Sequence, residues 1–405
     1  FLKKYLNILK TIMHYNNLFN KLIQKPDNYT VRWWIITSLA ILMFISFITL
    51  KHTSIETSIL SSTFIKQGIW FSLGCLFFII VQWIRIQFFQ EYAFHFYIFL
   101  LILISITYFM PSIGGAQRWI SIWFISFQPS ELGKLILVFI LAKILSDNKE
   151  NTSEIKLLIT SLLLAIIPSL MIFKQPDFGT AIVYGFIVMP MLYWSGIKTF
   201  YLFVIISPFI SIISAFNIVL FSVWMSLLII FTYLNQPKVF KGAFLFIVNI
   251  IFGIFSPYVW NNVLYPHQRG RILTLLNPMS DPHGAGYQVI QSIIAIGSGG
   301  VWGKGIGEGT QTQLRYLPVR DTDFIISVIA EEWGLFGIFL TLVSFYVLLY
   351  WMIIYAGSIS NQFSSLTLVG FSSIIFIHLI INMGMTVGLL PVTGLPAPFL
   401  SYGGS

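Results

Sequence analysis

A polar, glycine-rich segment between Tyr265 and Asp323 contains the side chains that could do chemistry in this chain. One of its four acidic residues is Asp281, and Pro282 biases the backbone before it to an extended form. A positioned carboxylate can accept the proton of an attacking hydroxyl. The segment also has five basic residues, whose cations form strong hydrogen bonds to phosphate. We therefore expect it to act on an anionic substrate, which Arg269, Arg271, Lys304 and Arg315 would bind.

Nine glycines lie between Gly284 and Gly309. Glycine permits positive φ angles and close approach of one backbone to another. Such a segment can turn its backbone N–H groups toward phosphate oxygens. The alternative is a re-entrant hairpin in which the glycines serve packing. The sequence alone leaves both interpretations open.

A second group of ionisable residues lies near the outer end of an expected membrane span. Glu131 and Lys134 are three residues apart, which puts them on one helical face. Arg118 lies in the preceding loop and is expected to join them in a polar cluster. Ionisable groups within spans are costly and are by default functional or paired. We predict either a structural ion pair or substrate contacts for Arg118, Glu131 and Lys134.

The composition is that of an integral membrane protein. The chain is 57% hydrophobic and 9% charged, with a mean hydropathy of +0.85, whereas about a quarter of the residues of a soluble domain are charged. The single cysteine, Cys75, excludes an intramolecular disulfide framework and a cysteine-built metal site. The net charge of +9 is better explained by a cytoplasmic anchor at an anionic leaflet than by nucleic-acid binding.

Hydropathy predicts an all-α, polytopic helical bundle with a large external loop, since about 20 residues cross a ~30 Å hydrocarbon core. Eleven spans are visible, and we expect a twelfth in the complete protein. The spans are 31–50, 68–84, 94–110, 131–146, 156–173, 179–195, 199–214, 217–234, 242–260, 324–355 and 364–389. With the lysine-rich start inside, the positive-inside rule places loop 261–323 outside.

Two regions are expected from this pattern. Residues 1–30 form a basic, amphipathic cytoplasmic segment without the features of a signal peptide. Residues 31–405 form one transmembrane domain that includes the external loop 261–323.

The end of the chain has a specific motif. The string NMGMTVGLLPVTGLPAPFLSYGGS at 382–405 closely resembles the signature of the SEDS family (shape, elongation, division and sporulation proteins), which includes RodA and FtsW. Further matches follow in family order: GAQRWI at 115–120, FQPSE at 127–131, QPDFGT at 175–180, DPHGAGY at 281–287 and TDFI at 322–325. The string GTQTQL at 309–314 resembles the elongation-type RodA branch more than the division branch.

The resemblance implies a peptidoglycan glycosyltransferase that polymerises lipid II during cell elongation and shape maintenance. One disaccharide-peptide unit passes from its undecaprenyl pyrophosphate to the 4-hydroxyl of another, outside the bacterial cytoplasmic membrane. The family motif marks Asp281 as catalytic. Because no second carboxylate is closely spaced with it, we expect direct inverting displacement. The pyrophosphate leaves already charged, so it needs cations and N–H donors more than a general acid.

The implied partners are the lipid II substrate, a class B penicillin-binding protein that cross-links the strands, and other elongation-machinery membrane proteins. A divalent cation, Mg or Mn, stays open at the pyrophosphate, although no sequence motif specifies a site. Two other functions compete with polymerisation. One is a lipid II flippase, whose headgroup path Arg118, Glu131 and Lys134 would line. The other is a scaffold for the cell-wall machinery. A flippase has no chemical need for Asp281.

The chain departs from the family pattern at several positions. His283 stands where Leu is frequent, Val319 where Glu is frequent and Ala397 where Leu is frequent, and Asn277 replaces the Asp of some relatives. The spans in 199–260 exceed the usual ten-span plan by two, and the resemblance assigns that pair no role.

Overall fold

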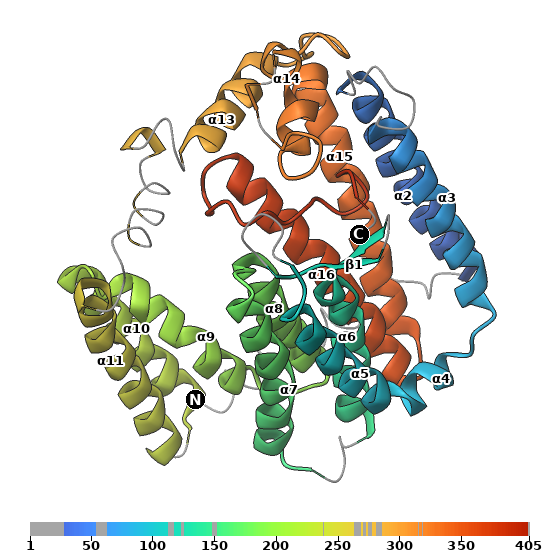
Figure 1. Ribbon diagram of the computed structural model, residues 1–405. Coiled ribbons are helices and arrows are strands. Elements are labelled where there is room, and N and C mark those ends of the chain that lie inside the picture. Colours follow the sequence, from blue (N-terminus) through green and yellow to red (C-terminus); the bar gives the residue numbers. More distant parts are fainter. Residues whose placement is uncertain are drawn as a thin grey trace, which may run out of the picture.

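The computed structural model describes residues 28–53, 63–111, 117–122, 125–147, 152–237, 239–262, 269, 273, 278–280, 286–314, 316–317 and 319–403. Within these ranges the chain is a helical bundle with one small β-hairpin (Figure 1). The elements in order are α2 (Asn28–Thr53), α3 (Thr63–Gln82), α4 (Ile86–Glu91), α5 (Ala93–Thr107), β1 (Ile120–Ile122), β2 (Ile125–Phe127), α6 (Pro129–Asp147), α7 (Glu154–Lys174), α8 (Phe178–Trp194), α9 (Thr199–Ser214), α10 (Ile218–Asn235), α11 (Val239–Asn262), η1 (Pro278–Ser280), α13 (Tyr287–Gly299), α14 (Thr310–Gln313), α15 (Ile325–Ser358) and α16 (Gln362–Thr386).

Each of the eleven predicted spans is a helix, which confirms the polytopic bundle. Among the described residues, seven of these helices are long and apolar enough to cross a membrane: α2, α3, α7, α10, α11, α15 and α16. The helices α5, α8 and α9 are apolar but shorter. Helix α6 has 19 residues and includes Glu131 and Lys134.

The all-α prediction missed the hairpin that β1 and β2 form before α6. The strands pair antiparallel, with Ile120 opposite Phe127 and Ser121 opposite Ser126. Each strand has only three residues, which is too short for an alternating pattern to stand out among apolar spans. The β-branched isoleucines and the aromatic residue favour the extended form. The hairpin occupies the loop predicted between the third and fourth spans.

Helix α16 lies at the centre of the bundle. In one apolar core α6 and α8 pack directly against it, with α5 on α6 and α7 on α8; in a second core α15 packs against it, with α2 on α15. More than half of its most apolar window is buried (56%), compared with 6% for α3. A helix that is apolar all round is buried or faces lipid. We conclude that α16 holds the two halves of the bundle together, whereas most of α3 faces the acyl chains.

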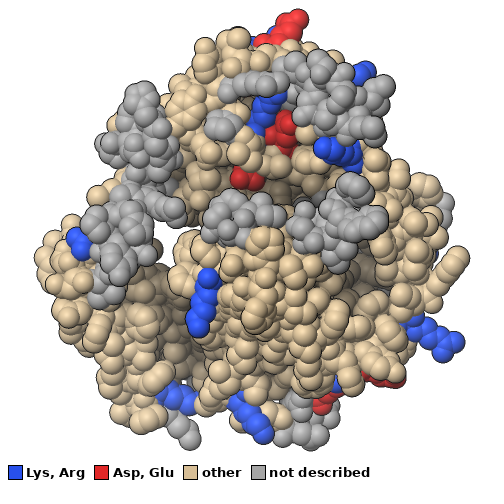
Figure 2. Space-filling view, in the orientation of Figure 1, with Lys and Arg blue, Asp and Glu red and all other residues tan. Residues whose placement is uncertain are grey.

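The surface has the charge distribution that a bilayer requires. On the face in Figure 2, acidic and basic side chains gather in the upper part, around a hollow, and along the lower edge. The band between them is mostly uncharged. Large apolar side chains are exposed there, as expected where lipid replaces water.

Helices α9, α10 and α11 form a separate group at the left of the bundle in Figure 1. They share a small core of Trp224, Leu228 and Leu245, and α9 joins them to α8. A buried amide binds them together, because Asn249 donates to Ser207 Oγ at 2.9 Å and accepts from Ser211 Oγ at 2.6 Å. Polar side chains join membrane helices in this way. This group includes the two spans beyond the ten-span plan.

Candidate active site

The predicted catalytic residue, Asp281, lies outside the described residues, as do Arg271 and Arg315. Their assignments stay predictions. Arg269 is described, and its Nη2 donates to the backbone oxygen of Asn261 at 2.8 Å, at the end of α11. Its side chain therefore lies beside the last turn of α11, where the long loop begins.

The glycine-rich segment after α13 is inserted into a break in α15. Gly334 has a φ of 67°, which interrupts the helix. The segment satisfies backbone groups of α15 on both sides of the break: Leu335 N donates to Gly300 O at 3.0 Å, and Glu331 O accepts from Lys304 N at 3.0 Å. Gly305 N also donates to α15, at Glu332 O. Non-helical backbone at membrane depth is tolerated when neighbouring chain satisfies it in this way.

This insertion decides what the glycines do. A Cβ on Gly303 would lie 2.1 Å from Glu332 O, and one on Gly299 would lie 1.9 Å from Ala330 O. Only glycine allows the two backbones to approach so closely. The N–H groups of Lys304 and Gly305 face helix carbonyls, so the prediction of a phosphate cradle is wrong for these two groups. The packing alternative is the correct one at Gly299 and Gly303.

Lys304 is a predicted substrate contact, but its ammonium already has one partner on α15 and one in the loop. Its Nζ lies 2.8 Å from Glu331 Oε1 and 2.6 Å from Thr310 Oγ1. Glu331 is fully buried, and it also accepts hydrogen bonds from the N–H groups of Gln311 and Thr312, at 2.9 and 3.2 Å. This carboxylate therefore anchors the start of α14 to α15. We assign Lys304 to that anchor rather than to phosphate.

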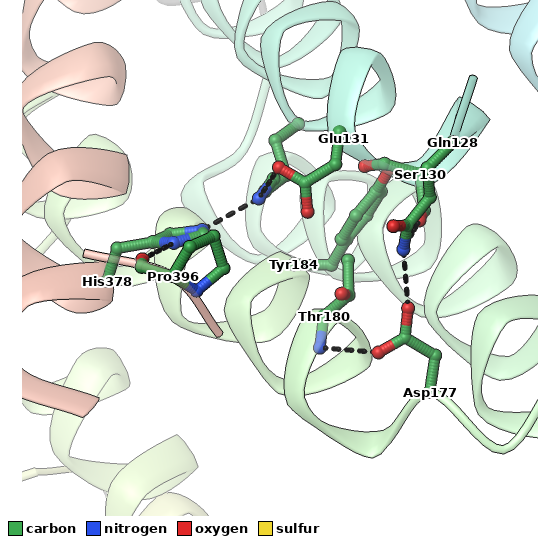
Figure 3. A network of polar contacts seen from close by, with 9 residues as sticks. Gln128, Ser130, Glu131, Asp177, Thr180, Tyr184, His378 and Pro396 are labelled. Carbon is green, nitrogen blue, oxygen red and sulfur yellow. Dashed lines mark hydrogen bonds and ion pairs between the residues drawn. The ribbon is translucent and has the colours of Figure 1, made fainter. Parts of the chain in front are cut away.

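The predicted pair Glu131–Lys134 is present on α6. Lys134 Nζ lies 2.7 Å from Glu131 Oε2, and the lysine side chain is 3% exposed. A third group completes the cluster: His378 Nε2 on α16 lies 2.7 Å from the same ammonium. Figure 3 shows His378 between this pair and the carbonyl of Pro396. A buried charge needs such compensation, because an unpaired one would cost several kcal/mol.

Arg118 pairs with a residue other than the one we expected. Its Nη1 lies 3.8 Å from Asp177 Oδ1, rather than against Glu131 or Lys134. Asp177 is 3% exposed, caps α8 by accepting from Thr180 N, and accepts from Gln128 Nε2 at 2.8 Å. Burial raises the pKa of Asp177, and the nearby Arg118 and the Thr180 hydrogen bonds oppose that shift.

Asp177 links Arg118 to the start of α6 through Gln128, whereas Glu131 and Lys134 pair with each other and with His378, so the prediction that Arg118 joins that pair is not confirmed. Gln128, which bonds Asp177, also donates to Ser130 Oγ at 3.0 Å. Tyr184 donates to the backbone oxygen of Ser130 at 2.9 Å, directly before Glu131. Figure 3 shows these side chains on one side of α8. The polar groups of three family motifs therefore meet at the N-terminal ends of α6 and α8.

Asp323 belongs to the same region. Burial raises the pKa of its carboxyl group, and the Thr322 hydrogen bond and the charge of Arg118 oppose the shift. Its backbone oxygen accepts from Asn382 Nδ2 at 2.9 Å, and the same amide donates to Leu395 O at 2.8 Å. Arg118 thus lies within electrostatic reach of the buried Asp177 and the half-buried Asp323.

The loop after α16, residues 387–403, is held against the segment that contains Asp323. Tyr402 N donates to Asp321 O at 2.7 Å, and Ser401 Oγ donates to Thr322 O. Ser401 also accepts from Ala397 N at 2.8 Å, which closes the loop on itself. The long family motif at the end of the chain therefore supports the site by holding the segment that contains Asp323 in place.

Sequence reasoning missed two contributors. His378 is an ionisable residue in the middle of an apolar span, and extending the search for intramembrane charges to histidine would have found it. Asp177 was visible only as a polar group at a span end. Its pairing with Arg118 depends on how the segment around the hairpin meets the start of α8, which no local pattern reveals.

Metal binding gains no support from the part of the chain that is described. Within those residues, no group of three or more histidine, cysteine, aspartate and glutamate side chains could hold an ion. The segment around Asp281 lies outside this search.

The family model of the FtsW, RodA and SpoVE proteins, described as "Cell cycle protein", matches residues 27–238 and 239–405. The chain is 32% identical over 340 residues to the peptidoglycan glycosyltransferase MrdB of Escherichia coli K12, covering 82% of this chain and 79% of that protein. It is 28% identical over 404 residues to the peptidoglycan glycosyltransferase RodA of Treponema pallidum, covering 91% of each.

Solved structures agree with the fold. One, described as "Structural coordination of polymerization and crosslinking by a peptidoglycan synthase complex", has a TM-score of 0.67 at 27% identity and covers 92% of both chains. The rod shape determining protein RodA of Thermus thermophilus has a TM-score of 0.59 at 22% identity, covering 92% of this chain and 90% of that one.

Proposed function

The chain belongs to the FtsW/RodA/SpoVE family of cell cycle proteins, and we propose that it is a peptidoglycan glycosyltransferase that polymerises lipid II. The observation that carries this proposal is the polar site at the N-terminal ends of α6 and α8. There Arg118 is 34% exposed while its carboxylate partner Asp177 is buried. An arginine held in this way from beneath can present its remaining donors to a phosphate.

The reaction would be an inverting displacement at the anomeric carbon. The 4-hydroxyl oxygen of one lipid II attacks C1 of the other unit, and the bond from C1 to the pyrophosphate oxygen breaks. The hydroxyl proton goes to the Asp281 carboxylate, and undecaprenyl pyrophosphate leaves with the bonding electrons. Arg118, Arg269, Arg271 and Arg315 are our candidates for binding the pyrophosphate.

A role other than substrate binding follows for three of the predicted site residues, Lys304, Glu131 and Lys134. Each is already paired: Lys304 with the buried Glu331, and Glu131 and Lys134 with each other, while His378 Nε2 accepts a hydrogen bond from Lys134. A substrate phosphate would have to displace such a partner before it could bind. We therefore assign these residues to holding the site in shape, and the binding of substrate to the arginines.

We propose that the site faces the outside of the cytoplasmic membrane. Support comes from the positive-inside rule and from one contact at the end of α2, where Gln313 Nε2 donates to His52 O at 3.1 Å. With the start of the chain inside, α2 ends outside, so α14 lies outside as well. The nucleotide-free, lipid-linked substrate would be used on that face.

We further propose a class B penicillin-binding protein as the partner and cell elongation as the setting. The synthase complex that resembles this chain is described by its coordination of polymerisation and cross-linking. The GTQTQL string at 309–314 and the relatives named RodA and MrdB favour the elongation branch.

A flippase is the competing function, and one assay separates the two. The purified protein would be placed in liposomes with fluorescent lipid II, and both glycan polymer and translocated lipid would be measured. The proposal predicts polymer, with Arg118→Gln reducing it and Asn217→Ala, a cap of α10 remote from the site, leaving it unchanged. Translocation without polymer, unaffected by replacing Asp281, would instead establish a flippase.

A further inference from the structure

One face of α16 is polar along three successive turns. His378, Asn382 and Thr386 are four residues apart, so they lie above one another on the helix. His378 contacts α6 and the loop after α16, and Asn382 contacts that loop and Asp323. The backbone oxygen of Thr386 accepts from Ser292 Oγ on α13 at 2.6 Å. These contacts connect the Glu131–Lys134 pair to the loop after α16, to Asp323 and to α13.

His378 is the member of this face that joins two otherwise separate parts. Its Nε2 lies 2.7 Å from Lys134 Nζ, and its Nδ1 lies 3.3 Å from Pro396 O. An ammonium has donors only, so Nε2 must be unprotonated and accept. The ring proton then resides on Nδ1, which donates to the Pro396 carbonyl. Figure 3 shows the ring placed between these two partners.

Both partners depend on this ring. Lys134 is 3% exposed, and His378 is 4% exposed, so water cannot easily replace either contact. Pro396 stands directly before Ala397, whose N–H donates to Ser401, and Ser401 in turn bonds Thr322 beside Asp323. A displacement of Pro396 would therefore be passed on to the segment that contains Asp323.

We propose that His378 is a positioning residue: its neutral imidazole fixes the Glu131–Lys134 pair and the 387–403 loop in one arrangement, so that the loop supports the outer site. A histidine buried merely as apolar volume would not have two polar partners from two separate elements. The inference rests on the proposed function for its activity readout, but its structural content does not.

The decisive variants are His378→Leu and His378→Gln. Leucine fills most of the space but offers neither acceptor nor donor. Glutamine offers an oxygen to Lys134 and an N–H to Pro396 from a side chain of similar reach. Leu228→Ala serves as the control for truncating a buried apolar side chain, because Leu228 lies on α10 in a core that contains no residue of the 387–403 loop.

Two readouts are needed. The first is steady-state polymerisation of lipid II by the full chain in detergent. His378→Leu should lower kcat about 10-fold or more, as expected for a lost hydrogen bond to a charged group, and His378→Gln should stay within about threefold of wild type. The second is amide hydrogen exchange of residues 387–403, which His378→Leu should accelerate and His378→Gln and Leu228→Ala should not.

The outcomes separate the inference from the proposed function. If wild type forms no polymer, the proposed function fails, and the exchange data alone decide the role of His378. If His378→Leu changes neither kcat nor exchange, or if His378→Gln is as impaired as His378→Leu, the inference is overturned.

Discussion

Replacing Glu331 tests how the external segment is attached to the bundle. This carboxylate is fully buried and accepts from Lys304, Thr310, Gln311 and Thr312. In Glu331→Gln, one oxygen becomes an NH₂ group that faces donors, so at least one buried donor loses its acceptor and Lys304 loses its counter-charge. Breaking a buried pair from one side costs roughly 3–5 kcal/mol, and the similar size of glutamine leaves no cavity to add to it.

The matched variant is Lys304→Met. Lys304 is 26% exposed, so water already screens part of its charge, and Glu331 keeps its hydroxyl and backbone donors. We expect this variant to cost about 1–2 kcal/mol, which is the range of a hydrogen bond to a charged group. The two replacements at either end of one ion pair should therefore differ, with the glutamate side clearly the more damaging.

Amide hydrogen exchange measures this locally. The N–H groups of Gln311 and Thr312 donate to the carboxylate, so Glu331→Gln should speed their exchange by about 100-fold, which corresponds to ~3 kcal/mol. Lys304→Met should change it by about 10-fold or less. Equal effects of the two variants, or a larger effect of Lys304→Met, would refute the idea that Glu331 anchors α14 to α15.

Three further outcomes are expected. Glu131→Ala should lower the unfolding free energy by ~3–5 kcal/mol, because it leaves the buried Lys134 charge uncompensated. The double variant Glu131→Ala/Lys134→Ala should lose less, because it removes that charge as well. Additive losses in detergent unfolding would speak against the pair. The raised pKa of Asp323 means that the folded protein holds this proton more tightly than the unfolded chain. Unfolding free energy should therefore fall as pH rises from about 4 through the raised pKa, and an Asp323→Asn variant that titrates identically would contradict that shift. Arg269→Gln should weaken lipid II binding in detergent while leaving stability nearly unchanged, since its hydrogen bond to Asn261 O lies at the surface and is worth about 1 kcal/mol. Unchanged affinity would remove Arg269 from the substrate site.

The helices could be predicted from sequence because each span has to satisfy its own backbone within lipid. Eleven apolar runs therefore correspond to eleven helices. The hairpin of β1 and β2 could not be found in the same way, since three residues per strand give too short a pattern. Its stability depends on pairing and on how the segment around it meets the start of α8.

The site was only partly predictable. The Glu131–Lys134 pair follows from helical spacing, so sequence was sufficient. The partners of Arg118 and Lys304 come from distant parts of the chain, Asp177 and Glu331. No periodicity relates such positions. The glycines after α13 were recognised as allowing close approach, but what they approach, the broken α15, depends on tertiary structure.

The central claim is that this chain joins lipid II units with Asp281 as the base. The most direct measurement is the rate of glycan-strand formation from purified lipid II by wild type and Asp281→Asn, in matched detergent. The substitution keeps the side chain's size and removes its basicity, so we predict a loss of about 10²–10⁴-fold with folding and membrane insertion intact. Activity of Asp281→Asn within about threefold of wild type would contradict the account.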